Sequence, residues 1–198
     1  NTDPTVEDTD GDNLLDGDEV NEFGSSPTSK DTDSDGIRDD WEVFQYNTDP
    51  AGNDADSDGL SDNAELEKYN SDPKSPDTDN DGLEDGPEIK KYETNVTNPD
   101  TDGDGLKDGW EVKGKSPSGA PLPNANPLHM DLYLETHASS NAQSYTENEI
   151  NSMKKAWAEM PVENPDDSTG ISLHIIQGSK LDHEIKISGA GENDLWEL

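Results

Sequence analysis

The chain has 198 residues, of which 48 are acidic and 13 basic, and its formal net charge is −35. A surface of this charge should repel nucleic acids and anionic membranes, and no apolar run is long enough to cross a membrane. Only 26% of the residues are hydrophobic and none is cysteine, so neither an ordinary hydrophobic core nor disulfides can stabilise the whole chain.

A twelve-residue acidic block occurs five times at a spacing of 23 residues. It reads Asp-x-Asp-x-Asp-Gly-apolar-x-Asp-x-x-Glu and begins at Asp8, Asp31, Asp54, Asp77 and Asp100. Five carboxylates crowded into one block would repel one another unless a cation lay among them. The alternative, a solvated acidic tail, needs neither a fixed period nor ordered apolar positions. The blocks therefore predict a row of divalent-cation sites.

The ligand chemistry of the blocks favours calcium. Calcium takes about six to eight oxygen ligands in a flexible shell, and a glutamate at position 12 can close that shell with both oxygens, as in an EF-hand loop. Glycine at position 6 permits the sharp turn that brings positions 1, 3 and 5 to one centre. Magnesium prefers a strict octahedron, and zinc or copper usually needs the histidine or cysteine that the blocks lack.

The predicted calcium ligands are the side chains at positions 1, 3, 5, 9 and 12 of each block and the backbone carbonyl at position 7. In the first block Asn13 stands at position 6, and this site is expected to survive because asparagine is the next best residue for a left-handed turn. The ligands are Asp8, Asp10, Asp12, Leu14, Asp16 and Glu19; Asp31, Asp33, Asp35, Ile37, Asp39 and Glu42; Asp54, Asp56, Asp58, Leu60, Asp62 and Glu65; Asp77, Asp79, Asp81, Leu83, Asp85 and Glu88; and Asp100, Asp102, Asp104, Leu106, Asp108 and Glu111.

The blocks depart from an EF-hand in two ways. Position 9 is always aspartate and the apolar residue sits at position 7, while the flanks are too short for two long helices. The period and this pattern resemble thrombospondin type 3 repeats, in the cysteine-free form found in secreted bacterial and archaeal proteins. The resemblance covers residues 1–115. It implies loops that wrap calcium ions, with a metal core in place of much of the hydrophobic core.

Apolar residues also recur, at positions 7, 13 and 16 of each copy, and are expected to stack into a thin continuous core. Positions 10–16 are predicted to form one or two helical turns. Position 16 is Phe23, Tyr46, Tyr69 and Tyr92 but Lys115 in the last copy, which predicts that the array ends there. Residues 1–115 are thus interpreted as five tandem repeats, with the tail of a preceding repeat at 1–7.

A turn signal follows the helical segments of the second and third copies. It reads Asn-Thr-Asp-Pro at 47–50 and Asn-Ser-Asp-Pro at 70–73, and its proline should end the helical turn. Asp49 and Asp72, with Asp3 in the same position of residues 1–4, are either outer calcium ligands or turn residues. In the fourth copy the glycosylation sequon Asn95-Val96-Thr97 replaces this signal, which predicts an altered, exposed turn.

The pattern changes after the repeats. Residues 116–127 are predicted to be a Pro/Gly-rich linker, and residues 128–198 a small α/β unit, expected to be incomplete. Met130–Thr136 and Ile171–Ile176 are predicted strands, and Thr146 and Glu149 form a capping box for the helix between them. The strands should be parallel with a right-handed crossover. Ile185 and Ile187 belong to a further strand or a loop.

The predicted fold is therefore a tandem calcium-loop repeat array with short helical turns and little regular structure, followed by a small C-terminal strand–helix–strand unit. This unit loosely resembles the start of an α/β domain found after such repeats in secreted archaeal and bacterial proteins, some of them zinc metalloproteases. Their His-Glu-x-x-His motif is absent, because His183-Glu184 is followed by Ile187 where the second histidine would stand. His129, His137, His174 and His183 have no ligand spacing, so the sequence makes no case for catalysis.

The leading hypothesis is a secreted or cell-surface calcium-binding structural protein. Its repeats would form a calcium-rigidified spacer that presents or links adhesion or assembly domains. Its partners would be calcium ions and other extracellular domains or subunits, on a cell, virion or filament surface. The alternative is the calcium-binding front part of a secreted zinc metalloprotease whose catalytic half is not in this chain. A calcium sensor exposes a methionine-rich apolar groove when it binds the ion. This hypothesis is disfavoured because the three methionines lie outside the array. Bound calcium ions would offset only part of the net charge of −35, and the negative charge that is left suits a high-salt habitat.

Overall fold

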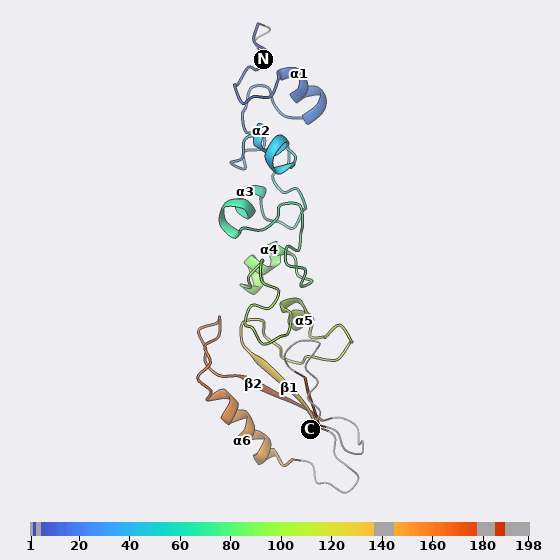
Figure 1. The fold of residues 1–198 in the computed structure, drawn as a ribbon, viewed down its shortest axis with the longest axis vertical. Helices are drawn as coiled ribbons and strands as arrows, with labels where there is room; N and C mark the ends of the chain where they lie inside the picture. The colour runs from blue at the N-terminus through green and yellow to red at the C-terminus, as the bar shows by residue number, and fades with distance from the viewer. Residues whose placement is uncertain (1, 3–4, 137–144, 178–184, 189–198) are drawn as a thin grey trace. The chain divides into compact units, whose positions relative to one another are not determined.

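A computed structural model describes residues 2, 5–136, 145–177 and 185–188 of the chain (Figure 1). The chain divides into two compact units, one of residues 1–78 and 84–90 and the other of residues 79–83 and 91–198. No helix of the described part is long and apolar enough to span a membrane. Asp3, His137, His183 and Glu184, which the sequence analysis singled out, lie outside the described residues.

A short helical segment occupies positions 9–16 in each of the first four repeats. It starts as an α-helical turn and continues as a wider π-helical turn. The segments are α1 (Asp16–Asp18) with η1 (Glu19–Phe23), α2 (Asp39–Trp41) with η2 (Glu42–Tyr46), α3 (Asp62–Ala64) with η3 (Glu65–Tyr69), and α4 (Asp85–Pro87) with η4 (Glu88–Tyr92). The predicted helical turns are confirmed.

The fifth helical segment ends differently. In the second repeat a left-handed residue at position 17, Asn47 with φ +56°, ends the wide turn by donating its N–H to the Glu42 carbonyl. In the fifth repeat Gly114 adopts φ +64° two positions earlier, and α5 (Asp108–Lys113) is an ordinary α-helix. Glycine takes the left-handed conformation without steric cost and is the usual residue at this helix end. The last helix therefore stops before Lys115, where the other copies carry an aromatic residue.

The interior of the repeats is acidic rather than apolar. At position 7, Leu14, Ile37, Leu60 and Leu83 are buried as expected. The residues at positions 13 and 16 are only partly covered, and Val20 is 64% exposed, so the predicted continuous apolar core is wrong at these positions. Apart from Leu14, the largest fully buried side chains of the described residues are the carboxylates of Glu19, Glu42, Glu65, Glu88, Asp12, Asp39, Asp62, Asp85 and Asp108.

The C-terminal part contains a three-stranded sheet in the order β2-β1-β3, with one helix (Figure 1). The elements are β1 (Asp131–Thr136), α6 (Glu147–Ala158), β2 (Ser172–Gln177) and β3 (Ile185–Ser188). β1 is parallel to β2 and antiparallel to β3, and Leu132 pairs with Leu173. The predicted parallel strand–helix–strand unit is confirmed, and the segment around Ile185 is a strand rather than a loop.

Local signals in the sequence set the helix and the connection before the sheet. Thr146 caps α6, because its hydroxyl accepts the Glu149 N–H while the Glu149 carboxylate accepts the Thr146 N–H at 2.7 Å. Between α5 and β1, the Leu122 N–H donates to the Gly114 carbonyl at 2.8 Å, and Leu122 is buried. The predicted linker thus contains a hydrogen-bonded turn in which Leu122 is buried.

Candidate metal centres

The first aspartate of each loop shapes the backbone. Asp8 accepts the Gly11 N–H on Oδ1 at 2.7 Å and the Asn13 N–H on Oδ2 at 3.1 Å. These two bonds wrap the loop around the carboxylate. The same pair of bonds is made by Asp31, Asp54 and Asp100.

Two residues of each loop have positive φ. At position 6, Asn13 has φ +82° and Gly36 has φ +106°, so the expected left-handed turn forms with asparagine in place of glycine. The second left-handed residue, at position 4, was missed by sequence reasoning. It is Gly11, Ser34, Ser57, Asn80 and Gly103, with φ between +61° and +78°. The sequence does carry a sign of this turn, because position 4 is always glycine, serine or asparagine.

A first cluster of carboxylates forms within each of the first three loops. One oxygen each from Asp8, Asp10 and Asp12 lie within 4.8 Å of one another, and two further loops repeat this arrangement with Asp31, Asp33 and Asp35 and with Asp54, Asp56 and Asp58. Within this cluster, Asp10 uses Oδ1 to accept the Asp12 N–H at 3.2 Å. Its buried Oδ2 has no hydrogen-bond partner among the described residues. The predicted ligands at positions 1, 3 and 5 thus lie close together in the first three loops.

A second cluster joins neighbouring repeats. Carboxylate oxygens of Asp12, Glu19 and Asp39 lie within 4.8 Å of one another, and those of Asp58, Glu65 and Asp85 do the same. These are positions 5 and 12 of one repeat with position 9 of the next. Position 5 is therefore common to the two clusters, and a cation in the second cluster would touch two repeats.

The aspartate at position 9 is held by its own loop while it faces the preceding one. Asp39 accepts the Thr32 N–H on Oδ1 at 2.8 Å and the Thr32 hydroxyl on Oδ2 at 2.6 Å. Asp16, Asp85 and Asp108 are held in the same way by the threonine at position 2. The sequence analysis placed position 9 in the shell of its own loop and gave no sign of this contact with the repeat before it.

The glutamates at position 12 are buried with unused ligand capacity. Glu19 accepts the Ser25 hydroxyl on Oε1 at 3.1 Å. Oε2 of Glu19, Glu42 and Glu65 is buried without a hydrogen-bond partner in the described part of the chain. Burial, followed by neighbouring aspartates, raises the pKa of Glu42 and of Glu65 to about 8. An unpaired buried carboxylate is costly, and a cation among these oxygens would remove that cost, so the residues fit a metal ion.

Backbone hydrogen bonds also tie successive repeats. The N–H at position 10 donates to Oδ2 of the position 5 aspartate in the repeat before. Asn63 donates to Asp35 at 3.1 Å, Gly86 to Asp58 at 2.7 Å and Gly109 to Asp81 at 2.9 Å. In these three repeats the second oxygen of the position 5 aspartate is thus oriented by the next repeat.

Several of the few basic side chains bind loop carbonyls. Lys30 donates to the Gly11 carbonyl of its own repeat at 2.6 Å, and Lys107 donates to the Asn80 carbonyl of the repeat before at 2.8 Å. Arg38 donates to the Asp12 carbonyl at 2.7 Å and pairs with Asp40 at 3.1 Å. These cations therefore lie against backbone oxygens and do not neutralise the carboxylate clusters themselves.

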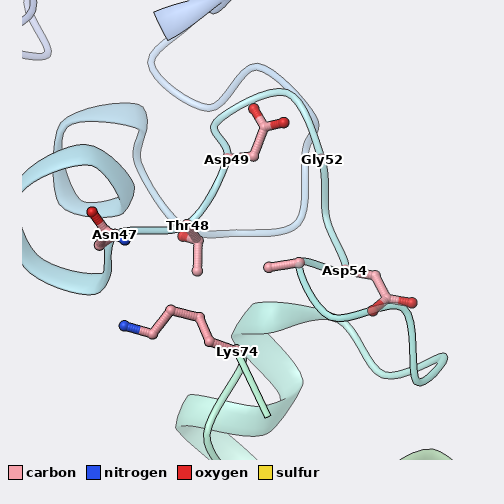
Figure 2. Close-up of a pocket in the computed structure, with 7 residues that line it drawn as sticks. Asn47, Thr48, Asp49, Gly52, Asp54 and Lys74 are labelled. Atoms are coloured by element: carbon pink, nitrogen blue, oxygen red, sulfur yellow. The ribbon is translucent and has the colours of Figure 1, made fainter. Parts of the chain in front are cut away.

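Asp49 and Asp72 act as turn residues. Asp49 accepts the Ala51 N–H at 3.0 Å, Asp72 accepts the Lys74 N–H at 3.1 Å, and both side chains are exposed. Figure 2 shows a pocket near this turn in which the Asp49 carboxylate points away from that of Asp54. Asn95 replaces this aspartate in the fourth repeat and makes the same bond, to the Thr97 N–H at 3.1 Å. The turn reading is thus favoured over the ligand reading.

Each of the two described histidines lies close to polar atoms of the sheet or of the residue before it. His174 Nε2 lies 2.6 Å from Asp131 Oδ1. His129 Nδ1 lies 3.2 Å from the Ser172 hydroxyl and 3.1 Å from the Met130 carbonyl. Neither arrangement supplies the several nitrogen ligands of a catalytic zinc site.

Comparison with known families agrees with this repeat structure. A family model described as the bacterial TSP3 repeat matches residues 8–30, 31–51, 54–76, 77–99 and 100–116. The matches coincide with the five acidic blocks and their helical segments and cover more than half of the chain. No curated protein and no solved structure gives a match. The resemblance that the sequence suggested for the C-terminal unit is therefore unconfirmed.

Proposed function

Because the chain belongs to the bacterial TSP3 repeat family, whose repeats are calcium-binding structural units, we propose that it is an extracellular spacer held in shape by Ca²⁺. On this proposal residues 1–115 are the array, residues 116–127 connect it, and residues 128–198 are an α/β unit that docks to a partner. The observation that carries the proposal is the buried, incompletely paired carboxylates between successive repeats.

The candidate ligands are those of the two cluster types. Positions 1, 3 and 5 hold one ion in the loop, with the carbonyl at position 7 as a further oxygen. Positions 5 and 12 and the next repeat's position 9 hold another. All of these donors are oxygens, and calcium accepts such mixed, flexible oxygen shells. The ion would supply positive charge that offsets the repulsion among the carboxylates.

The inter-repeat clusters support the role of a spacer. Asp58 contributes to the cluster of its own loop, to the cluster with Asp85, and to the bond from the Gly86 N–H. Ion binding at such a residue fixes two repeats relative to each other, so rigidity should follow calcium concentration. Extracellular calcium modules bind with Kd values of about 10⁻⁴–10⁻³ M, which suits a calcium-rich exterior. The partners would be other extracellular domains or subunits of a surface assembly.

Nothing in the described residues favours the protease alternative. His174 is engaged by Asp131, and α6 carries no histidine. We therefore propose no catalytic role.

Small-angle scattering at constant high ionic strength tests the proposed function. In millimolar calcium we expect a particle of fixed maximum dimension, because occupied clusters lock neighbouring repeats. After excess EGTA we expect a larger and more variable dimension. Magnesium in place of calcium serves as the control. It should restore the fixed maximum dimension only in part, because magnesium demands a stricter octahedral shell. Identical profiles in calcium and in EGTA would sink the proposal.

A further inference from the structure

The last repeat lacks a following repeat of its own kind, yet its interior is just as buried. Family matches end at residue 116, while Asp102 and Glu111 are 5% and 3% exposed. In the first and third repeats the corresponding glutamates, Glu19 and Glu65, share a cluster with position 9 of the next repeat. A different element must therefore complete the cluster around Glu111.

The first residue of β1 takes the place of the missing repeat. The Asp131 N–H donates to Asp104 Oδ2 at 2.7 Å. Asp104 is the position 5 aspartate, and this is the bond that Gly86 makes to Asp58 and Gly109 makes to Asp81 in the array. The start of the sheet thus donates to the fifth loop as position 10 of the next repeat does in the array.

The Asp131 side chain also copies a position 9 aspartate. It is 4% exposed, and its two oxygens accept one backbone and one side-chain hydrogen bond. Oδ2 accepts the Asn126 N–H at 2.8 Å, and Oδ1 lies 2.6 Å from His174 Nε2. In Asp108 the same two bonds come from the N–H and hydroxyl of Thr101. A carboxylate held in this way keeps lone pairs for a cation.

The buried Glu111 points to a cation at this place. Both of its carboxylate oxygens are buried without a hydrogen-bond partner among the described residues. Burial, and then the charges of Asp104, Asp102 and Asp131, raise the pKa of Glu111 to about 10. The carboxylates that most affect Glu111 are therefore those of the fifth loop and of β1.

We propose that Asp104, Glu111 and Asp131 form an additional calcium site, which holds the start of β1 against the fifth repeat. The proposal rests on the calcium binding proposed above for the repeats. It adds Asp131, which lies outside the acidic blocks and the family matches, as a ligand. The donors are oxygens only, because His174 Nε2 is directed at Asp131, so the site suits calcium better than zinc.

His174 would act as a positioning residue. Its ring stacks on Tyr133 with centroids 4.5 Å apart, and Tyr133 is 2% exposed. The stacked ring holds Nε2 at the Asp131 carboxylate and thereby sets the orientation of that ligand. An ion that links the sheet to the array would make the stability of β1 depend on calcium, even though the core of the α/β unit is apolar.

Two measurements on the full chain test the proposal. Native mass spectrometry counts bound calcium, and hydrogen exchange reports the protection of residues 131–136. Glu111→Gln should bind one ion fewer than the wild type, and in calcium its β1 protection should fall to the level that the wild type shows in EGTA. Glu163→Gln, an exposed residue near the sheet, is the matched control and should change neither reading.

Each outcome decides something definite. An unchanged ion count with unchanged β1 protection in Glu111→Gln overturns the junction site, because a protonated, metal-free Glu111 is well replaced by glutamine. A wild type that binds no calcium at all overturns the proposed function instead. Protection in repeats one to three shows whether Glu111→Gln is folded. If it is not, Asp131→Asn is measured in the same way, and an unchanged ion count there overturns the site.

Variants of His174 test whether this residue orients the Asp131 carboxylate or only supports the fold. His174→Ala should raise the calcium concentration needed for half-maximal β1 protection by about 10–100-fold, without removing an ion at saturation. His174→Gln keeps an N–H donor near the place of Nε2 and should recover most of the loss. Equal midpoints for the wild type and His174→Ala would show that His174 does not orient a ligand.

Discussion

The repeats and the α/β unit are both folded, but the side chains that fill their interiors differ in kind. In the repeats the fully buried side chains are mainly carboxylates, such as Glu42 and Asp62, arranged in clusters with unpaired oxygens. In the α/β unit buried Tyr133 and Leu173 lie on strands paired over their whole length. A chain with few apolar residues can thus build an ordinary sheet core in one region, provided that metal supplies the missing stability in the other.

Calcium removal should separate the two regions most clearly. Without the ion, repulsion among the clustered carboxylates should unfold the array, while the sheet beyond its first residue keeps most of its packing. Hydrogen exchange in calcium and in EGTA should show complete loss of protection in residues 8–113 and only partial loss in β2. Equal loss in both regions would contradict the comparison.

Acid should partly replace calcium in the array. Folding raises the pKa of Glu42 and Glu65 from 4.5 to about 8 and that of Glu19 to about 7. A carboxyl group with a raised pKa holds its proton more tightly in the folded state. The stability it contributes is therefore present at low pH and lost as pH rises through the folded value. After calcium removal, the helical circular-dichroism signal of the array should recover in part as pH falls from about 8 to about 5. A signal that does not recover would contradict this assignment.

Single ligand changes should sharpen the picture of shared clusters. Asp58→Ala removes a residue common to two clusters and should cost about 3–5 kcal/mol in calcium, with two ions lost. Asp56→Ala removes a member of the loop cluster and should lose one ion. Asp72→Ala, at an exposed turn, is the control and should keep the full count. Native mass spectrometry and denaturant unfolding give the two readings, and equal ion losses for Asp58→Ala and Asp56→Ala would argue against a shared ligand.

A core change in the sheet should act without regard to calcium. Leu173→Ala removes a buried side chain of β2 and should cost the α/β unit about 2–5 kcal/mol. Protection in residues 8–90 should stay as in the wild type, and the loss in β2 should be similar with and without calcium. Reduced calcium binding in the first three repeats of this variant would show that the regions are not independent.

The close contact between repeats should be sensitive to one methyl group. A Cβ at Gly86 would lie 2.2 Å from the Asp58 carbonyl oxygen, whereas one at Gly17, the same repeat position, would meet nothing within 4 Å. Gly86→Ala should cost about 1–3 kcal/mol by thermal unfolding in calcium. Gly17→Ala should be neutral or slightly stabilising, since alanine favours the helical turn. Equal effects of the two changes would mean that the repeats do not approach this closely.

Local features of the fold were predictable where local sequence decides them. The carboxylate spacing, the left-handed Asn13, the helical turns, the Thr146 cap and the parallel strands all follow from short-range rules. The exposure of Val20 did not follow, because the recurrence of apolar residues predicts their burial, whereas the glutamates next to them are the buried residues.

Contacts between repeats were the part that the sequence left undetermined. A period of 23 residues is compatible with any offset between neighbours, so it did not show that Asp39 faces Glu19. For the same reason nothing in the sequence distinguished Asp131 from the other acidic residues outside the blocks. These placements depend on how one loop meets the next, which hydrogen bonds such as that from Gly86 to Asp58 establish.

The most direct test of the central claim is a calcium titration of the full chain, followed by native mass spectrometry and by near-ultraviolet circular dichroism. We predict that ordered tertiary signal appears together with bound calcium, and that at saturation the ions outnumber the acidic blocks, because Asp12 and Asp58 each belong to a loop cluster and to a cluster between repeats. A chain that shows its full tertiary signal before any calcium binds would contradict the claim that calcium completes the interior of the repeats.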